Sequence, residues 1–225
     1  MRAQQAQAGE FAGFPEQALD FYEGLEADNT KAYWTEYRPT YERCVRAPLL
    51  ALCAVLEPEF GPAKLFRPYR DVRFSADKSP YKTAQGALLI GADGDHVWYL
   101  QLGAPGLLVA TGYHEMASDQ VARYRAAVDD ETTGEQLAAV LDDVEAAGHR
   151  VVGEVMKTRP RGTDPAHPRL ELLRFRTLTA MHQFGPEPWL HTPEVAQVVA
   201  RTWGEMAALD AWLGRNVGPS RLPRG

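Results

Sequence analysis

The sequence predicts an α+β fold in a single domain, in which an antiparallel meander packs with N-terminal and C-terminal helices. Three observations support this class. Apolar residues recur at helical spacing near both ends of the chain, short apolar runs separated by turn residues fill its middle, and no regular strand, helix and strand succession appears. We expect residues 11–213 to form this domain, because no linker or repeat divides the 225 residues, with flexible tails at 1–10 and 214–225.

The N-terminal quarter of the chain has a helical pattern. Pro15 suits the first position of a helix, and Ala18, Phe21, Tyr22 and Leu25 follow it at the spacing of one helical face. These residues predict a first helix with its apolar face on the core.

A second helical stretch follows, and we expect Asn29 to be its N-cap. Pro39 and Pro48 should break or kink this stretch into shorter pieces. Cys44 and Cys53 fall within it. Their spacing sets the two side chains about 180° apart around the helix axis, so they cannot form a disulfide within one helix.

Beyond Gly61 and Pro62 the pattern changes to short apolar runs, which predict strands joined by hairpins. The predicted strands are residues 64–68, 84–90, 96–102 and 107–113. Turn sequences at 93–94 and 104–106 separate the last three, which should form the antiparallel meander. Alternation along the strand at 96–102 places Trp98, Leu100 and Leu102 on one face and Val97, Tyr99 and Gln101 on the other.

The C-terminal half mixes helices with further strands. We expect Ser118 to cap one helix, and Thr133 with Gln136 to form a capping box for the next. The further strand candidates are residues 151–156 and 173–182. A last helix begins at 192–194 and carries apolar residues along one face.

Composition and missing motifs disfavour several classes of function. The net charge of -6 has the wrong sign for a chain whose whole surface meets nucleic acid or anionic lipid. No phosphate-binding glycine loop, nucleophile elbow, H-E-x-x-H or C-x-x-C motif is present, and the six histidines are scattered. We therefore expect no metal site and no cofactor.

The location and the partners follow from equally simple features. The longest uncharged apolar stretch, Ala47–Leu56, is about half the length of a membrane span, so we expect no membrane partner. Unpaired cysteines and the lack of an apolar signal-peptide core at the N-terminus favour the cytoplasm. The sequence does not determine the oligomeric state.

Positive charge is concentrated in two segments of the chain. Residues 64–82 carry six basic side chains against two acidic ones, and residues 150–176 carry seven against three. Each segment has a net charge of +4, so the rest of the chain carries -14. If the fold brings the two segments together, they form a positive concavity that needs an anion or interleaved carboxylates.

The leading hypothesis is a pocket for a small anionic ligand, phosphorylated or carboxylated, in either a binding protein or an enzyme. Arginine offers a planar fork to such groups, lysine a mobile charge, and tyrosine a hydroxyl donor. The expected ligand-binding residues are Arg67, Arg70, Asp71, Arg73, Asp77, Lys78, Tyr81, Lys82, Lys157 and His167. Asp71 and Asp77 would orient the arginines. Asp164 and His167 are suited to proton exchange, although an ordinary turn is the favoured interpretation there, and no reaction follows from these residues.

Two other hypotheses remain open. In a purely structural or partner-binding domain, the arginine and aspartate side chains of residues 70–77 pair with one another and hold a long loop on the sheet. In a nucleic-acid-associated module, the same bases contact phosphates while Tyr69, Phe74 or Tyr81 stack on nucleobases. The acidic remainder of the chain makes the second of these less favoured than a small ligand.

The run R-D-V-R-F-S-A-D-K-S-P-Y-K-T at residues 70–83 is a long and specific motif. It resembles the signature of a conserved hypothetical protein family catalogued as domain of unknown function 2461. Supporting matches are residues 29–34, 41–42, 48, 157–164, 167–168 and 172–173. The resemblance covers residues 11–213 and implies one domain in which the basic motif matters, without an established activity. Ala76 departs from the family pattern, where a lysine is expected.

Overall fold

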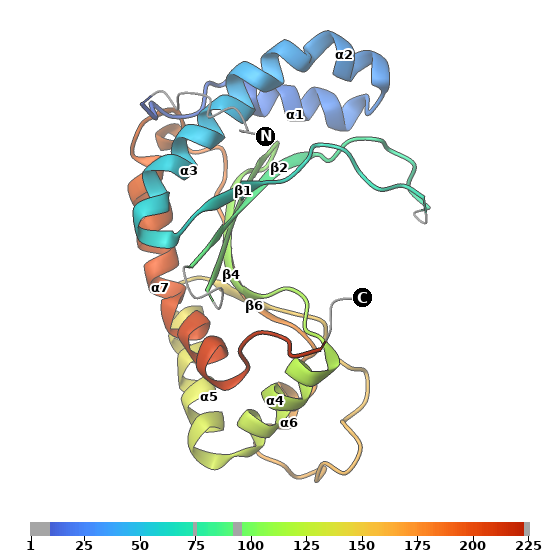
Figure 1. Ribbon diagram of the computed structural model, residues 1–225, viewed down its shortest axis with the longest axis vertical. Helices are drawn as coiled ribbons and strands as arrows, with labels where there is room; N and C mark the ends of the chain where they lie inside the picture. Colours follow the sequence, from blue (N-terminus) through green and yellow to red (C-terminus); the bar gives the residue numbers. More distant parts are fainter. Residues whose placement is uncertain (1–9, 74–75, 92–95, 223–225) are drawn as a thin grey trace. The chain divides into compact units, whose positions relative to one another are not determined.

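The computed structural model describes residues 10–73, 76–91 and 96–222 (Figure 1). It confirms the α+β class, with helices and a six-stranded antiparallel sheet in the order β1-β2-β3-β4-β6-β5. The strands are β1 (Ala63–Leu65), β2 (Ala84–Ile90), β3 (Val97–Gly103), β4 (Gly106–Tyr113), β5 (Arg150–Val152) and β6 (Leu178–Gln183). The expected turn at 93–94 and all but the last residue of the expected tail at 1–10 lie outside the described residues.

The helices are α1 (Gln17–Ala27), α2 (Lys31–Thr40), η1 (Tyr41–Arg46), α3 (Ala47–Phe60), α4 (Ser118–Asp129), α5 (Glu131–Ala146), α6 (Leu170–Leu173), η2 (Pro188–His191) and α7 (Val195–Asn216). The chain stays helical through Pro39 and Pro48, with a π-helical turn, η1, between them. In place of the expected break, the helix changes type: its backbone hydrogen bonds join residues five apart in η1 and four apart on either side. Within the described part of the chain, no helix is long and apolar enough to span a membrane.

The predicted meander is present as β2, β3 and β4, which are consecutive neighbours in the sheet. Burial alternates along β3 as expected, with Trp98, Leu100 and Leu102 buried and Val97, Tyr99 and Gln101 half-buried. Side chains on one face of this strand therefore belong to the core, while those on the other face are reached by solvent.

Other predicted strands have different limits. β1 and β5 are 3 residues each, shorter than the predicted 64–68 and 151–156. Leu173 was expected to begin a strand and instead ends α6. This leucine is buried in the core, and the Tyr124 hydroxyl donates to the carbonyl of Leu172 at 2.9 Å. A distant side chain thus decides a local structure that alternation suggested to be extended.

Three helix caps also differ from the prediction. Ala117, and not Ser118, is the N-cap of α4. Thr30, and not Asn29, is the N-cap of α2, because its hydroxyl accepts the backbone N–H three residues later. Asn29 instead binds the backbone of Tyr81. Asp130, and not Thr133, caps α5, since its carboxylate accepts the N–H of Thr133 at 2.9 Å.

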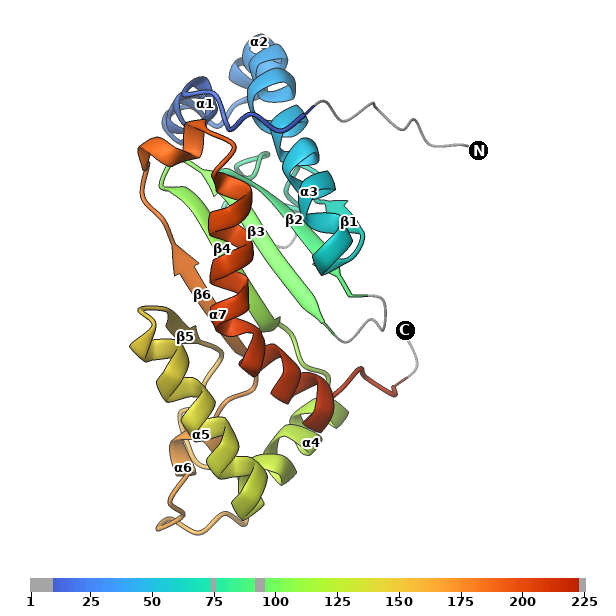
Figure 2. The same ribbon diagram turned by 90° about the vertical axis from the view of Figure 1, so that its left-hand side faces the viewer.

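The chain forms two compact units. The first comprises Met1–Leu89, Tyr99–Val109 and Gln183–Arg201, and the second Ile90–Trp98, Ala110–His182 and Thr202–Gly225. Fully buried side chains of the first unit include Phe14, Leu25, Leu49 and Leu52. Those of the second include Tyr124, Leu137, Leu209 and Trp212. Figure 2 shows α4 and α5 of the second unit as consecutive helices joined by a short turn. The domain boundaries expected from the sequence stay a prediction.

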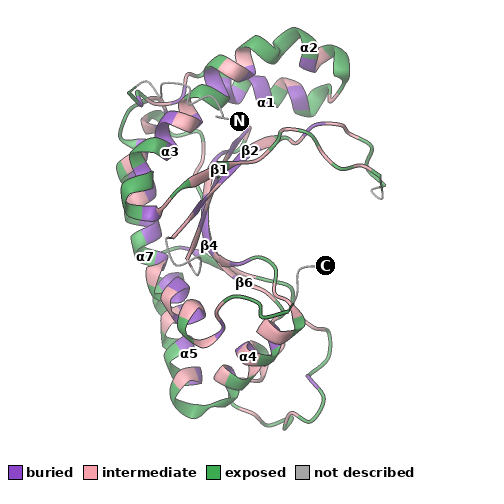
Figure 3. Ribbon diagram, in the orientation of Figure 1, coloured by how far each residue is buried: buried purple, intermediate pink, exposed green. Residues whose placement is uncertain are grey.

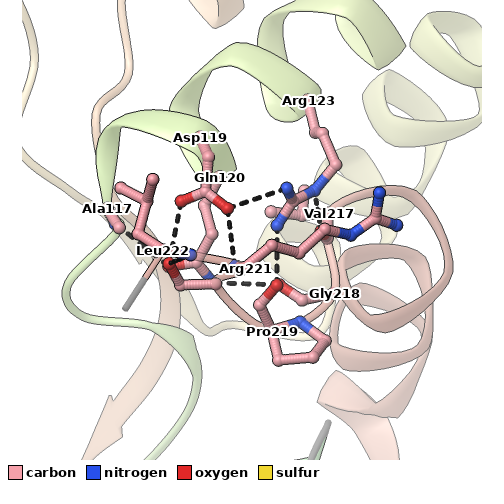
Figure 4. A network of polar contacts seen from close by, with 10 residues as sticks. Ala117, Asp119, Gln120, Arg123, Val217, Gly218, Pro219, Arg221 and Leu222 are labelled. Carbon is pink, nitrogen blue, oxygen red and sulfur yellow. Dashed lines mark hydrogen bonds and ion pairs between the residues drawn. The ribbon is translucent and has the colours of Figure 1, made fainter. Parts of the chain in front are cut away.

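The residues after α7 are hydrogen-bonded to α4 within the second unit (Figure 4). The contacts join Arg123 to the carbonyls of Val217 and Pro219, Gln120 to the carbonyl of Gly218, and Asp119 to the N–H of Arg221. In all of these hydrogen bonds, a side chain of α4 binds a backbone group of the terminal segment. Residues 217–221, expected to be part of a flexible tail, are thus held by side chains of a helix.

Gly134 in α5 and Gly204 in α7 should respond in opposite ways to alanine. A Cβ at position 134 would lie 2.3 Å from the carbonyl oxygen of Val128 and 2.4 Å from Arg169 Nε, whereas a Cβ at 204 meets no atom within 4 Å. Gly204→Ala should therefore raise the free energy of unfolding by about 0.5–1 kcal/mol through helix propensity. Gly134→Ala should lower it by about 1–3 kcal/mol through overpacking. Urea denaturation measures both, and stabilisation by both substitutions would contradict the close packing of Arg169 on α5.

Candidate functional site

The first basic segment forms a hairpin between β1 and β2. We call residues 66–82 the basic hairpin, of which 74–75 are not described. The backbone bonds that join its sides run from Arg70 N to Pro80 O at 2.9 Å and from Lys82 N to Pro68 O at 2.8 Å. Tyr69 and Tyr81 therefore lie opposite each other. Figure 3 shows that most of the hairpin is exposed or half-buried, while Tyr81 is only 5% exposed.

Side chains of the first unit hold the base of the hairpin through its backbone. Asn29 makes two such bonds, because its Nδ2 donates to Tyr81 O at 3.0 Å and Tyr81 N donates to its Oδ1 at 3.1 Å. Gln85 Nε2 donates to Phe66 O at 2.7 Å, and Gln85 Oε1 accepts from the Tyr41 hydroxyl at 2.6 Å. The base of the hairpin is thus fixed by neutral amides and not by its charges.

Ion pairs lie near the tip of the hairpin. Arg70 pairs with Asp77, and Arg73 Nη2 lies 2.7 Å from Asp71 Oδ2. Hydrogen bonds from Ser79, followed by the bond from Arg70, lower the pKa of Asp77. The bond from Arg73 lowers the pKa of Asp71. The internal pairing that the structural hypothesis expected among these four charged residues is therefore present.

Both carboxylates of the segment are engaged in this way, but several of its cations are not. The cations that pair with no carboxylate among the described residues are Lys64, Arg67, Lys78 and Lys82. Lys78 Nζ donates to the carbonyl of Val72 at 3.0 Å, and Lys82 Nζ lies 5.0 Å from the centre of the Phe66 ring. The hairpin register makes Arg70 and Lys82 diagonal neighbours on one face, because paired residues and residues two apart share a face.

Polar side chains of β3 lie next to Phe66, the ring that Lys82 contacts. The rings of Phe66 and Tyr99 are 6.0 Å apart, and the Tyr99 hydroxyl donates to Gln101 Oε1 at 2.6 Å. The amide N–H groups of Gln101 have no partner within the described part of the chain. Gly86 makes this arrangement possible, because a Cβ there would lie 2.7 Å from the Tyr99 hydroxyl. A chain of contacts therefore links Lys82 through the Phe66 ring to Tyr99 and to the amide of Gln101.

The opposite face of the hairpin carries Arg67 and the two tyrosines. The Tyr81 ring stacks on Trp34, with ring centres 4.4 Å apart and planes inclined by 9°. Tyr69 covers Tyr81 and is itself 46% exposed. Tyr81 is thus a packing residue that supports the hairpin, and the exposed aromatic surface belongs to Tyr69.

Two of the expected ligand-binding residues, Lys157 and His167, belong to the second unit, whereas the hairpin belongs to the first. His167 Nδ1 accepts the backbone N–H of Arg169 at 3.0 Å, and its Nε2 lies 3.3 Å from Asp129 Oδ1. The neutral ring therefore carries its proton on Nε2. The carbonyl of Lys157 accepts from Arg174 at 3.4 Å. Their part in one site with the hairpin stays a prediction.

Arginines around the loop at 153–169 use their donors on backbone carbonyls. These bonds run from Arg125 Nε to Leu173 O at 3.2 Å, from Arg169 Nε to Val128 O at 2.8 Å, and from Arg174 Nε to Met156 O at 2.8 Å. Arg176 forms an ion pair with Glu154 at 2.9 Å. Three of the seven bases counted in the second segment, Arg169, Arg174 and Arg176, therefore contribute to the fold of the second unit.

The fold also joins histidines that are far apart in the sequence. His149 Nδ1 lies 3.0 Å from His182 Nδ1, and His149 Nε2 lies 2.9 Å from Glu205. Burial, followed by the neighbouring His149, lowers the pKa of His182. His96 pairs with Asp210, whose pKa is raised by burial. Among the described residues, no three His, Cys, Asp or Glu are arranged to hold a metal ion, and the absence of a metal stays a prediction.

The comparison with protein families agrees with the motif at 70–83. The sequence model of a family described as conserved hypothetical protein (DUF2461) matches residues 17–212 of the 225. The chain belongs to this family. No curated protein and no solved structure matches it. The part that matches the conserved hypothetical protein family contains the whole basic hairpin and the residues that hold it.

Several residues of the site within this family match were missed by sequence reasoning. Asn29 was assigned to a helix cap, and Gln85 to an ordinary strand position. Tyr99 and Gln101 were correctly placed on the face of β3 that is not core, and two polar residues there are a signal for a site. Phe66 gave no signal, because its contact with Lys82 depends on the hairpin register.

The carboxyl group of Asp77 should titrate below its ordinary pKa of 3.8, because Ser79 and Arg70 stabilise the ionised form. Its contribution to stability is therefore present above about pH 4 and is lost as the pH falls through the lower pKa of the folded state. Arg70→Ala should raise the pKa of Asp77 but not to its ordinary value, since Ser79 still donates hydrogen bonds to the carboxylate. A carboxyl NMR titration measures both values. An unchanged pKa in the Arg70 variant would contradict the ion pair.

Proposed function

We propose that this protein binds a small anionic ligand, phosphorylated or carboxylated, on the hairpin face that carries Lys82 and Arg70. The observation that supports the proposal most directly is the uneven use of charge in the hairpin. Its carboxylates, Asp71 and Asp77, are engaged by arginines, while the Lys82 ammonium lies against the Phe66 ring without a carboxylate among the described residues. An anion would supply the counter-charge that the hairpin itself does not.

The groups around Lys82 suit this chemistry. Gln101 offers amide donors, since its oxygen is already used by the Tyr99 hydroxyl. Arg70 has five N–H donors, so it can hold Asp77 and still bind a further oxygen. The donors of Lys82, Arg70 and Gln101 match the acceptor oxygens of a phosphate or a carboxylate. The proposal concerns binding and assigns no catalytic residue.

A nucleic-acid function is the second candidate, and the opposite face of the hairpin favours it. Tyr69 is 46% exposed, and Arg67 lies two residues before it in the hairpin. An exposed ring beside a cation suits a stacked base with its phosphate. Tyr81 is buried and so is not free to stack on a base, and Phe74 lies outside the described residues.

Inorganic phosphate and sugar phosphates should raise the melting temperature of the protein at low salt. Lys82→Ala should weaken the binding of inorganic phosphate by about 1.5–3 kcal/mol, the scale of a hydrogen bond to a charged group. The free protein should keep its stability, because Lys82 makes no ion pair with a described residue. Isothermal titration calorimetry measures the affinity. Lys31→Ala on α2 is the matched control and should leave it unchanged.

Arg70→Ala separates ligand binding from a purely structural role. If the hairpin binds an anion, this variant also loses phosphate affinity while the fold survives. If its charges only pair internally, the variant is less stable and the wild-type protein responds to no phosphate, sugar phosphate or dicarboxylate. That combination would refute the proposal. A response to short oligonucleotides alone, removed by Tyr69→Ala, would favour the nucleic-acid function instead.

A further inference from the structure

A groove with a volume of about 590 Å³ lies in the second unit. It is lined by one side of α5, by residues 165–172, and by Val151 and Phe175. Its apolar lining includes Leu141, Val151, Leu172 and Phe175. Pockets for small molecules typically measure about 300–1,000 Å³ and are mostly apolar, so the groove has an appropriate size and surface. The groove shares no residue with the hairpin face proposed above. Its lining does include His167, which the sequence analysis expected to bind the anionic ligand.

Most polar side chains in the lining already have partners. Arg169 donates to the carbonyl of Val128 at 2.8 Å, and Glu171 accepts from Arg174 at 2.7 Å. His167 has both ring nitrogens engaged, one by a backbone N–H and one near a carboxylate. These groups hold the wall of the groove, and they leave little capacity for a ligand.

Two carboxylates of α5 are the exception. Asp142 and Glu145 line the groove, are exposed, and make no ion pair with any described residue. They are three residues apart in a helix, so their side chains are neighbours on one face. The carbonyl that Arg169 binds leaves its positive charge in place, but the lining sets three carboxylates against this one arginine, so the charge of the groove is negative.

We propose that this groove binds a small organic cation, a primary amine that carries an aliphatic or aromatic body. The ammonium group lies at Asp142 and Glu145, where three N–H donors meet two carboxylates. The apolar body covers Leu141, Val151 and Phe175 and removes their surface from water. A carboxylate or phosphate of the same size is repelled by the same two residues. The site is therefore independent of the proposed anion site.

The test uses hexylammonium, hexan-1-ol and hexanoate, which share an apolar chain and differ in charge. Titration calorimetry on the full chain should show hexylammonium binding at least tenfold more tightly than either of the others. Amide shifts in a ¹H–¹⁵N spectrum should report the contact at Val151 and Phe175. Equal affinity for the three compounds, or no binding of hexylammonium, would overturn the proposal.

Substitutions in α5 separate the contribution of the two carboxylates to binding from that of the apolar groove. Asp142→Asn with Glu145→Gln should lower the affinity for hexylammonium at least tenfold, to that of hexan-1-ol, whereas Asp143→Asn outside the lining should not change it. Ala138→Phe should fill the groove and weaken all binding, while Ala139→Phe should not. Circular dichroism checks the fold of each variant. If the double carboxylate variant is folded and binds hexylammonium as well as the wild type does, the proposal is wrong.

Discussion

Backbone hydrogen bonding in two irregular segments is the constraint on which much of this structure depends. The basic hairpin and the loop after β5 leave the sheet, so many of their carbonyl and amide groups lack a strand partner. Such groups cost free energy when they are buried without a partner. Asn29 satisfies both polar groups of Tyr81 in the hairpin, and Arg174 satisfies the carbonyl of Met156 in the loop. Each segment is thus held by side chains from elsewhere in the sequence or from its own far end.

This constraint changes how the charge pattern is interpreted. The sequence shows two segments of equal net charge, and a simple count treats them alike. In the second segment Arg169 and Arg174 donate to carbonyls, as does the nearby Arg125. In the hairpin, the neutral side-chain amides of Asn29 and Gln85 donate to the backbone carbonyls instead. Among the described residues, Arg67 and Lys82 of the hairpin therefore keep their charged groups without an ion-pair partner, whereas Arg169 and Arg174 of the second segment hold the backbone of their unit.

The parts of the fold that local patterns determine were predictable. Alternation in β3 and the turns around it indicated the meander, and apolar spacing indicated the helices at both ends. The site was less predictable, because its contacts join distant positions. Asn29 and Tyr81 are 52 residues apart, and Tyr124 contacts a carbonyl 48 residues away in α6. The cap assigned to Asn29 and the strand assigned to Leu173 were wrong for this reason.

The two proposed sites take opposite charges, and the same argument explains both. At the hairpin tip, Asp71 and Asp77 are used locally by Arg73 and Arg70, so the charge that remains is positive. In the groove, the carboxylates of Asp142 and Glu145 on α5 have no ion-pair partner among the described residues, so the charge that remains is negative. A charged ligand responds to the summed charge around it, so an ion pair within the fold contributes little and a charged group without an opposite partner contributes most. The residual charge after ion pairs are assigned, and not the composition of a segment, is thus the basis of the ligand chemistry that we propose for each unit.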